Sequence, residues 1–267
     1  MELQDLLYSQ GFGTRRVCVG LVQKGWVRLQ TDGQWHTCED PWLVVDARLD
    51  WPFEVQGQAW VYRERAHLML HKPAGTECSR KPSAWPSIYS LLPAPLRQRP
   101  QKGAVDGVQA VGRLDQDTTG LLLLSDDGQF IHRMASPRHH VPKVYQVHTV
   151  DAITAPQIDK LLAGVVLDDD PQAVRAAACE ALGSHHVALT LTEGKYHQVK
   201  RMLAAVGNRV QALHRSSMGE LHLPADLLPG QWRWLTHSDL QALGYTPGAG
   251  AAQDAKKRTT VSSAWSG

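Results

Sequence analysis

A run of four leucines, residues 121–124, is the feature that most limits what this chain can fold into. Gly120 precedes the run and SDDG (residues 125–128) follows it, so the segment has the length and the flanking turn residues of a buried strand. Arg113 and Asp115 stand at the entrance to this strand. A surface turn whose aspartates accept hydrogen bonds from nearby backbone amides is the ordinary explanation for such residues. A functional loop is the alternative, and other motifs must decide between the two.

Composition allows a sizeable core and sets the expected location of the protein. With 267 residues, 43% of them hydrophobic, the chain is long enough for one large domain or two modest ones. Its four cysteines are far apart and form no C-x-x-C pair, so they indicate neither a zinc site nor a disulfide framework. The N-terminus lacks a basic region followed by an apolar stretch, and no segment approaches the roughly 18 apolar residues of a membrane span. We therefore expect a cytoplasmic protein that does not enter a membrane.

The positive charges are unevenly distributed. A net charge of +2 says little about a polyanionic partner. However, residues 6–31 carry four cations and no acid, residues 129–150 carry three cations and four histidines without an acid, and residues 192–219 carry five cations and one acid. Such stretches predict basic surfaces that follow a phosphate backbone, although solvated faces of helices have the same composition.

The first sixty residues predict a small module. Its order is helix, helix, hairpin, with Thr14 as the N-cap of the second helix, Gly25 as its stop and Asp32-Gly33 as the hairpin turn. The segment LLYSQGFGTRRVCVGLVQKGWVRL resembles the S4 RNA-binding module, and we assign residues 1–60 to it. The resemblance implies that RNA is contacted from a helical face carrying Arg15, Arg16, Lys24 and Arg28. Because residues 1–60 contain five cations and eight acids, a module for protein contact is the alternative.

A second domain is expected after a linker at residues 61–66, within the polar stretch 57–66. A strand over HLMLHK ends at Lys72-Pro73, and the proline-rich residues 78–109 predict loops and turns. Strands are then predicted at LLLL, KVYQVHTV, HHVALTLT and RVQALHR, with a helix within EGKYHQVKRMLAAVGN. We place this domain at residues 67–245 and a disordered tail, rich in Gly, Ala, Ser and Thr, at residues 246–267.

Three separated motifs occur in one order: GRLDQDTTGLLLLSDDG, SPRHHVPKVYQV and EGKYHQVKRMLAAVGNRVQALHR. Together they resemble pseudouridine synthases of the RsuA type, which modify small-subunit ribosomal RNA. The resemblance implies an α+β fold, in which a small S4-like helical and hairpin module precedes a catalytic domain with a large mixed, mainly antiparallel sheet flanked by helices. It also implies isomerisation of uridine to pseudouridine in 16S rRNA with no metal, nucleotide or redox cofactor. Asp115 then corresponds to the catalytic aspartate of the family.

The resemblance assigns further residues to the site. Tyr145 matches a tyrosine that packs on the target uracil, Lys200 matches a basic residue that pairs with the aspartate, and Arg113 matches an arginine near the displaced base. Ordinary alternatives are a core aromatic, a solvated helix lysine and a structural guanidinium bridge. The residues with the best placement for RNA contacts elsewhere in the motifs are Arg138, His139, Lys143 and Arg215. We expect no metal ligand at His139-His140, because a third ligand at recognisable spacing is missing.

Competing functions remain to be compared with this prediction. A synthase with almost the same motifs could act on 23S rRNA, and a non-catalytic RNA-binding or ribosome-assembly protein could keep the same scaffold. A metal-dependent hydrolase would use Asp115, Asp117, Asp126 and Asp127, although adjacent acids beside a glycine usually form turns. We expect a monomer whose partner is ribosomal RNA, either free or within a small-subunit assembly particle.

Overall fold

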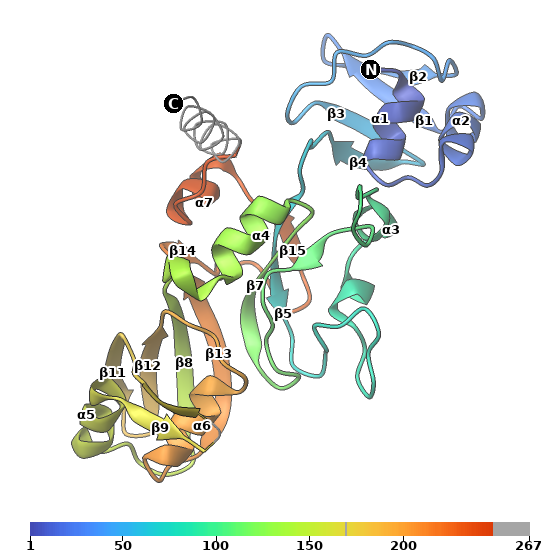
Figure 1. Ribbon diagram of the computed structural model, residues 1–267. Coiled ribbons are helices and arrows are strands. Elements are labelled where there is room, and N and C mark those ends of the chain that lie inside the picture. Colours follow the sequence, from blue (N-terminus) through green and yellow to red (C-terminus); the bar gives the residue numbers. More distant parts are fainter. Residues whose placement is uncertain (169, 248–267) are drawn as a thin grey trace, which may run out of the picture.

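The N-terminal part of the chain is a small α/β unit, seen in the computed structural model, which describes residues 1–168 and 170–247 (Figure 1). The expected tail therefore lies outside the described residues from position 248 onward. The unit begins with helices α1 (Leu3–Ser9) and α2 (Arg15–Gln23). Four strands follow: β1 (Val27–Thr31), β2 (Gln34–Cys38), β3 (Pro52–Val55) and β4 (Gln58–Val61).

The expected helix, helix, hairpin order is present, and a second hairpin completes the sheet. Thr14 caps α2 by accepting a hydrogen bond from the Val17 amide at 3.4 Å. Asp32 and Gly33 have φ values of 52° and 78°, as a two-residue hairpin turn of type I′ requires. The strands lie antiparallel in the order β2-β1-β3-β4 in this described part. Leucines of α1 pack with Phe53 in a separate core, so the unit has its own hydrophobic centre.

One large sheet dominates the rest of the molecule. Within the described residues it has nine strands, in the order β11-β12-β8-β13-β7-β5-β15, with β14 beside β13 and β6 beside β7. Their bounds are β5 (His67–Lys72), β6 (Gln109–Ala110), β7 (Thr119–Ser125), β8 (Lys143–Thr149), β11 (Ala178–Gly183), β12 (His186–Leu191), β13 (Val210–Met218), β14 (Leu221–His222) and β15 (Trp232–Trp234). Strands β7 and β13 run parallel and the other pairs run antiparallel. The predicted large mixed, mainly antiparallel sheet is confirmed.

Short helices and a hairpin flank this sheet (Figure 1). They are η1 (Ile88–Leu91), α3 (Ala94–Gln98), α4 (Gly128–Ala135), η2 (Pro137–His139), α5 (Ala155–Ala163), α6 (Gln198–Ala205), α7 (His237–Ala242), and the hairpin of β9 (Val165–Leu167) with β10 (Asp170–Val174). Among the described residues, none of the helices has the length and apolar character needed to cross a bilayer.

The four leucines form the middle of β7, and all four are fully buried. Leu121 and Leu123 pack into one core cluster, and Leu122 and Leu124 pack into the other. Alternate residues of a strand point to opposite faces, so the two clusters cover both faces of β7. A strand with two buried faces has an unbroken apolar sequence rather than an alternating one. The predicted buried strand is therefore confirmed, and it supports the loop that precedes it.

Gly120 allows β7 to approach β13 closely. Its φ is 108°, and a Cβ atom at this position would lie 2.2 Å from the carbonyl oxygen of Arg215. The parallel pairing aligns Thr119 with His214 and Gly120 with Arg215. This contact places residues 113–118, just before β7, next to β13, whose other neighbour, β8, carries Tyr145.

Arg99 joins the two parts of the molecule. Its side chain is only 2% exposed and donates from Nε to the Asp126 carboxylate at 2.6 Å and from Nη1 to Gln10 Oε1 at 2.9 Å. Nη2 donates to the carbonyl oxygens of Arg63 and Glu64, at 2.7 and 3.1 Å. The end of α1, the segment after β4 and the end of β7 therefore share one buried guanidinium.

Candidate active site

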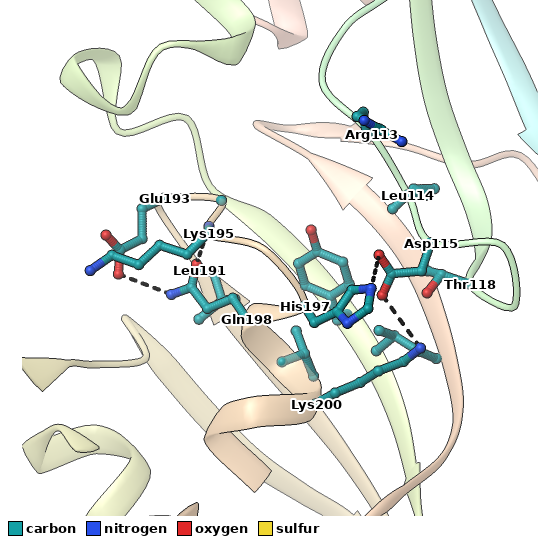
Figure 2. A pocket seen from close by; sticks show the side chains of 14 residues that line it. Arg113, Leu114, Asp115, Thr118, Leu191, Glu193, Lys195, His197, Gln198 and Lys200 are labelled. Atoms are coloured by element: carbon teal, nitrogen blue, oxygen red, sulfur yellow. Dashed lines mark hydrogen bonds and ion pairs between the residues drawn. The ribbon is translucent and has the colours of Figure 1, made fainter. Parts of the chain in front are cut away.

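The loop between β6 and β7 carries Asp115 into a pocket, where it points toward His197 and Lys200 (Figure 2). Tyr145 of β8 and Leu213 of β13 line the same pocket. The pocket therefore brings together residues of all three sequence motifs. Its lining is completed by Arg113, Leu114, Thr118, Leu191, Glu193, Gly194, Lys195, Gln198 and Val199.

Two basic side chains lie near the Asp115 carboxylate without a short contact to it. Its Oδ1 lies 3.4 Å from His197 Nε2, and its Oδ2 lies 3.4 Å from Lys200 Nζ. Lys200 lies closer to Asp117, at 2.7 and 2.9 Å from the two carboxylate oxygens. Burial lowers the pKa of Lys200, but the hydrogen bond to Asp117 and the charges of both carboxylates outweigh it and raise that pKa. Lys200 is therefore charged and shared between two aspartates.

Lys72 fixes the backbone of the same loop from inside the protein. Its side chain is fully buried, and Nζ donates to the carbonyl oxygens of Pro73, Gln116 and Thr118 at 3.0, 3.2 and 2.9 Å. Burial lowers the pKa of Lys72, and electrostatic interactions with nearby Cys78, Asp117 and Asp115 offset only part of that effect. Sequence reasoning placed Lys72 only at the end of a strand. A lysine in an apolar strand directly before a proline was the signal available.

Tyr145 is 9% exposed and lies near the centre of the sheet. It pairs with Leu189 of β12 on one side and with Arg215 of β13 on the other. Paired residues of antiparallel strands face the same side of a sheet, so this strand position sets the direction of the ring. The phenol ring forms one wall of the Asp115 pocket.

Helix α6 begins at the pocket with His197 in its N-cap position. His197 has a left-handed backbone, with φ 47° and ψ 33°, and its ring stacks on that of Tyr196 at a centroid distance of 3.8 Å. Val199 and Met202 bury the other side of the helix, which leaves Lys200 at the border, as expected. Sequence reasoning did not select His197, although it directly precedes the QVK segment of the third motif.

Comparison with known proteins agrees with this geometry. The family model described as RNA pseudouridylate synthase matches residues 66–205. The chain belongs to that family. The ribosomal small subunit pseudouridine synthase A of Haemophilus influenzae is 39% identical over 191 residues, covering 72% of this chain and 78% of the relative. An uncharacterized RNA pseudouridine synthase of Bacillus subtilis is 38% identical, covering 91% and 98%. The predicted resemblance to RsuA-type synthases is confirmed.

A solved structure shares most of this architecture. A crystal structure of a pseudouridylate synthase is 32% identical, covers 91% of this chain and 99% of its own, and superposes with a TM-score of 0.62. The match spans both the N-terminal unit and the large sheet, because it covers nearly the whole described chain. The chain is thus an enzyme of the pseudouridine synthase class, as its motifs predicted.

The expected RNA contacts of the synthase differ in their exposure. Arg113, Arg138 and His139 are exposed, and Lys143 is half-buried. Burial, together with the Arg215 charge, lowers the pKa of Lys143 to about 8. Arg215 is only 2% exposed and donates from Nε to the Leu121 carbonyl oxygen at 2.8 Å. Arg215, expected to contact RNA, thus lies on a covered face of the sheet, and its contact with RNA stays a prediction.

The cations of the N-terminal unit do not form one acid-free helical face. Arg15 begins α2, but it pairs with Asp5 of α1 at 2.7 Å. Arg28 lies on β1, not on a helix, and pairs with Glu54 of β3 at 3.2 Å. The expected face is therefore wrong in this respect, because folding brings acids from other elements next to two of its cations. Arg16 and Lys24 are exposed, as expected.

The four aspartates of the alternative hydrolase do not converge. Asp115 and Asp117 precede β7, whereas Asp126 and Asp127 follow it. Six residue steps of about 3.3 Å separate the ends of this strand by roughly 20 Å, too far for one ion. Asp126 accepts instead from the Ala66 amide at 2.7 Å. In residues 1–168 and 170–247, no group of three or more His, Cys, Asp or Glu side chains could hold a metal ion.

Proposed function

We propose that this synthase isomerises uridine to pseudouridine in 16S ribosomal RNA, with Asp115 as the nucleophile. The observation that carries the proposal is the convergence of Asp115, Tyr145 and Lys200, from three separate motifs, in one pocket. The names of the relatives in Haemophilus influenzae and Escherichia coli, both ribosomal small subunit pseudouridine synthases, support the choice of 16S rRNA over 23S rRNA.

The reaction fits a site built from side chains. The bond from C1′ to N1 breaks, the uracil turns, and a bond from C1′ to C5 forms, while C5 loses a proton and N1 gains one. Product and substrate are isomers, so no electrons or groups are transferred to another molecule. Asp115 supplies the carboxylate that acts at C1′ or at the base, and the Tyr145 ring packs on the uracil and helps to exclude water.

The substrate uridine must leave its stack in folded RNA to reach Asp115. Arg113 stands on the catalytic loop and is exposed, so it can fill the vacated position or clamp a phosphate. Exposed Arg138 and His139, with half-buried Lys143, extend the RNA contact along η2 and the start of β8. The helix and hairpin architecture of residues 1–60 supports an S4-like RNA-binding role. Its expected contacts are exposed Arg16 and Lys24, together with Arg15 and Arg28, which pair with acids.

The remaining assignments follow from this substrate. The catalytic domain spans residues 67–245, and residues 61–66 connect it to the N-terminal module. The synthase acts in the cytoplasm as a monomer, on rRNA that is either free or within a small-subunit assembly particle. Mapping pseudouridine in both rRNAs of a deletion strain tests the choice of substrate: the missing site should lie in 16S rRNA.

Substitution of Asp115 tests the catalytic assignment. Asp115→Asn keeps the shape of the side chain but removes its charge, so product formation should fall by at least about a thousandfold while RNA affinity stays within about twofold. Release of tritium from RNA labelled at C5 of uridine measures turnover, and filter binding measures affinity. Asp159→Asn, an exposed residue on α5, is the matched control and should keep full activity. Appreciable turnover by the Asp115 variant would contradict the assignment.

A further inference from the structure

Asp117 competes with Asp115 for the same lysine. The Lys200 ammonium lies at 2.7 and 2.9 Å from the Asp117 oxygens and at 3.4 Å from Asp115 Oδ2. Distances below about 3 Å are those of strong charge-assisted hydrogen bonds, whereas 3.4 Å is an ion pair without such a bond. The lysine is therefore bound to Asp117 and only attracted to Asp115.

The second oxygen of Asp115 is held in the same loose manner. His197 Nε2 lies 3.4 Å from Oδ1 and comes from the N-cap of α6, three residues before Lys200. Both basic groups thus orient the Asp115 carboxylate from one helix without a short hydrogen bond to either oxygen. The oxygens of this carboxylate therefore keep lone pairs for another partner. About a quarter of the Asp115 side chain is exposed.

A carboxylate nucleophile would be impaired both by a short ion pair with Lys200 and by the loss of that lysine. A short ion pair with Lys200 would stabilise the ionised carboxylate and occupy a lone pair, which lowers its reactivity toward carbon. Loss of the lysine would leave the carboxylate without a cation to favour ionisation and orient it. In the structure Lys200 divides its one positive charge between two carboxylates. This arrangement lies between a short ion pair and the loss of the lysine.

We propose that Asp117 is a positioning residue that holds Lys200 at a distance from Asp115 and so leaves the Asp115 carboxylate oriented and free to react. This assignment rests on the proposed role of Asp115. Asp117 acts only through Lys200, and its side chain is 60% exposed at the outer side of the lysine.

The protonation of Asp117 agrees with this role. Burial raises the pKa of Asp117, but the hydrogen bond and the charge of Lys200 outweigh it and leave that pKa below its usual value. Asp117 is thus ionised wherever the enzyme works near neutral pH. An exposed ion pair of this kind adds little to folding stability, so its removal leaves the fold intact.

Asp117→Asn tests the inference at the Asp115 carboxylate itself. An uncharged amide holds the ammonium weakly, so Lys200 Nζ should move from 3.4 Å to within about 3 Å of an Asp115 carboxylate oxygen. A crystal structure of the variant measures that distance and needs no substrate. An unchanged or longer distance between Lys200 and Asp115 would overturn the inference, even if the proposed function were wrong.

Turnover provides the second measurement. With saturating RNA, kcat of Asp117→Asn should fall about tenfold while KM stays within about twofold, and the acidic limb of the pH profile should move to lower pH. Asp117→Glu keeps the charge and should recover part of the rate, and Asp159→Asn should match the wild type. A loss that appears in KM alone, or a melting temperature lowered in parallel with kcat, would show that Asp117 contacts RNA or supports the fold instead. Absence of pseudouridine with the wild-type enzyme would refute the proposed function and leave the measured distance between Lys200 and Asp115 standing.

Discussion

At the scale of single residues, Asp127 shows how a carboxylate can stabilise the protein far from the reaction. It accepts from the Tyr245 hydroxyl at 2.5 Å and lies 3.3 Å from His67 Nε2. Burial raises the pKa of Asp127, but the hydrogen bonds from His67, Tyr245 and the Phe130 amide outweigh it and hold that pKa well below its ordinary value. Folding therefore favours the ionised form.

We predict that Asp127→Asn destabilises the protein in a pH-dependent way. Near neutral pH the variant should lose about 2 kcal/mol of unfolding free energy, because the partners of a buried charge are left poorly paired. The carboxyl of an unfolded chain titrates near pH 3.9, so the contribution is fully present above about pH 5 and is lost as the pH falls toward the lower folded pKa. Urea unfolding at about pH 7, 5 and 3 measures the difference from wild type. An equal difference at all three pH values would contradict the role of charge.

Individual site residues were predictable from sequence only where a motif named them. Asp115, Tyr145 and Lys200 belong to motifs and meet in one pocket. The pairing of Lys200 with Asp117 joins residues 83 positions apart, and nothing local signals it. The burial of Arg215 was not predictable for a related reason: it depends on which face of β13 is covered, and the charge of the residue gives no information about that.

At the scale of elements, the loop that carries Asp115 is positioned by its neighbours as well as by its own contacts. Residues 113–118 enter a central strand, β7, whose four leucines are buried on both faces. The ammonium of Lys72, at the end of β5, binds two carbonyl oxygens of this loop. Within the loop, the Thr118 amide donates to the Asp115 carbonyl oxygen at 3.1 Å. The direction of the Asp115 side chain therefore depends on β5 and β7 together.

Lys72→Met should loosen that loop while keeping most of the side-chain volume. The carbonyl oxygens of Gln116 and Thr118 lose their buried donor, at a cost of about 1 to 3 kcal/mol in stability. Because Asp115 is then less well oriented, kcat should fall at least about tenfold at saturating RNA. Thermal melting and single-turnover kinetics measure the two effects, and exposed Lys81→Met is the control. A destabilised variant with wild-type kcat would limit Lys72 to a structural role.

Several long elements were predicted from their periods, whereas helices α4 and α5 and the shortest strands were not. The apolar run of β7, the alternation of β8 and the apolar stripe of α6 each span seven or more residues and carry a clear period. Strands β6 and β14 have two residues each, too few for any period, and they exist because a neighbouring strand offers free hydrogen-bonding groups. Their positions follow from the assembled sheet.

At the scale of the whole molecule, the N-terminal unit is attached through buried polar contacts as well as through the chain. Arg99 binds Gln10 of the unit and Asp126 of the large sheet. Gly11 packs so closely that a Cβ atom there would lie 2.1 Å from the Pro95 carbonyl oxygen. Such a junction fixes the distance between the N-terminal unit and Asp115, which suits an enzyme that must select one uridine in a large folded RNA.

Replacement of Arg99 should release this junction and separate RNA selection from chemistry. Arg99→Met leaves Asp126 as an unpaired buried charge, so the junction should lose about 3 kcal/mol or more, and the double variant with Asp126→Asn should recover part of that loss. We expect faster proteolysis between residues 62 and 66 and a larger radius of gyration. We also expect kcat/KM to fall on complete 16S rRNA at least about fivefold more than on a short RNA that contains only the target loop. Exposed Arg97→Met, two residues away on α3, should leave all three measurements unchanged. If Arg99→Met lowers kcat/KM equally on both RNAs, the junction stabilises the catalytic domain and does not determine where the N-terminal unit contacts RNA.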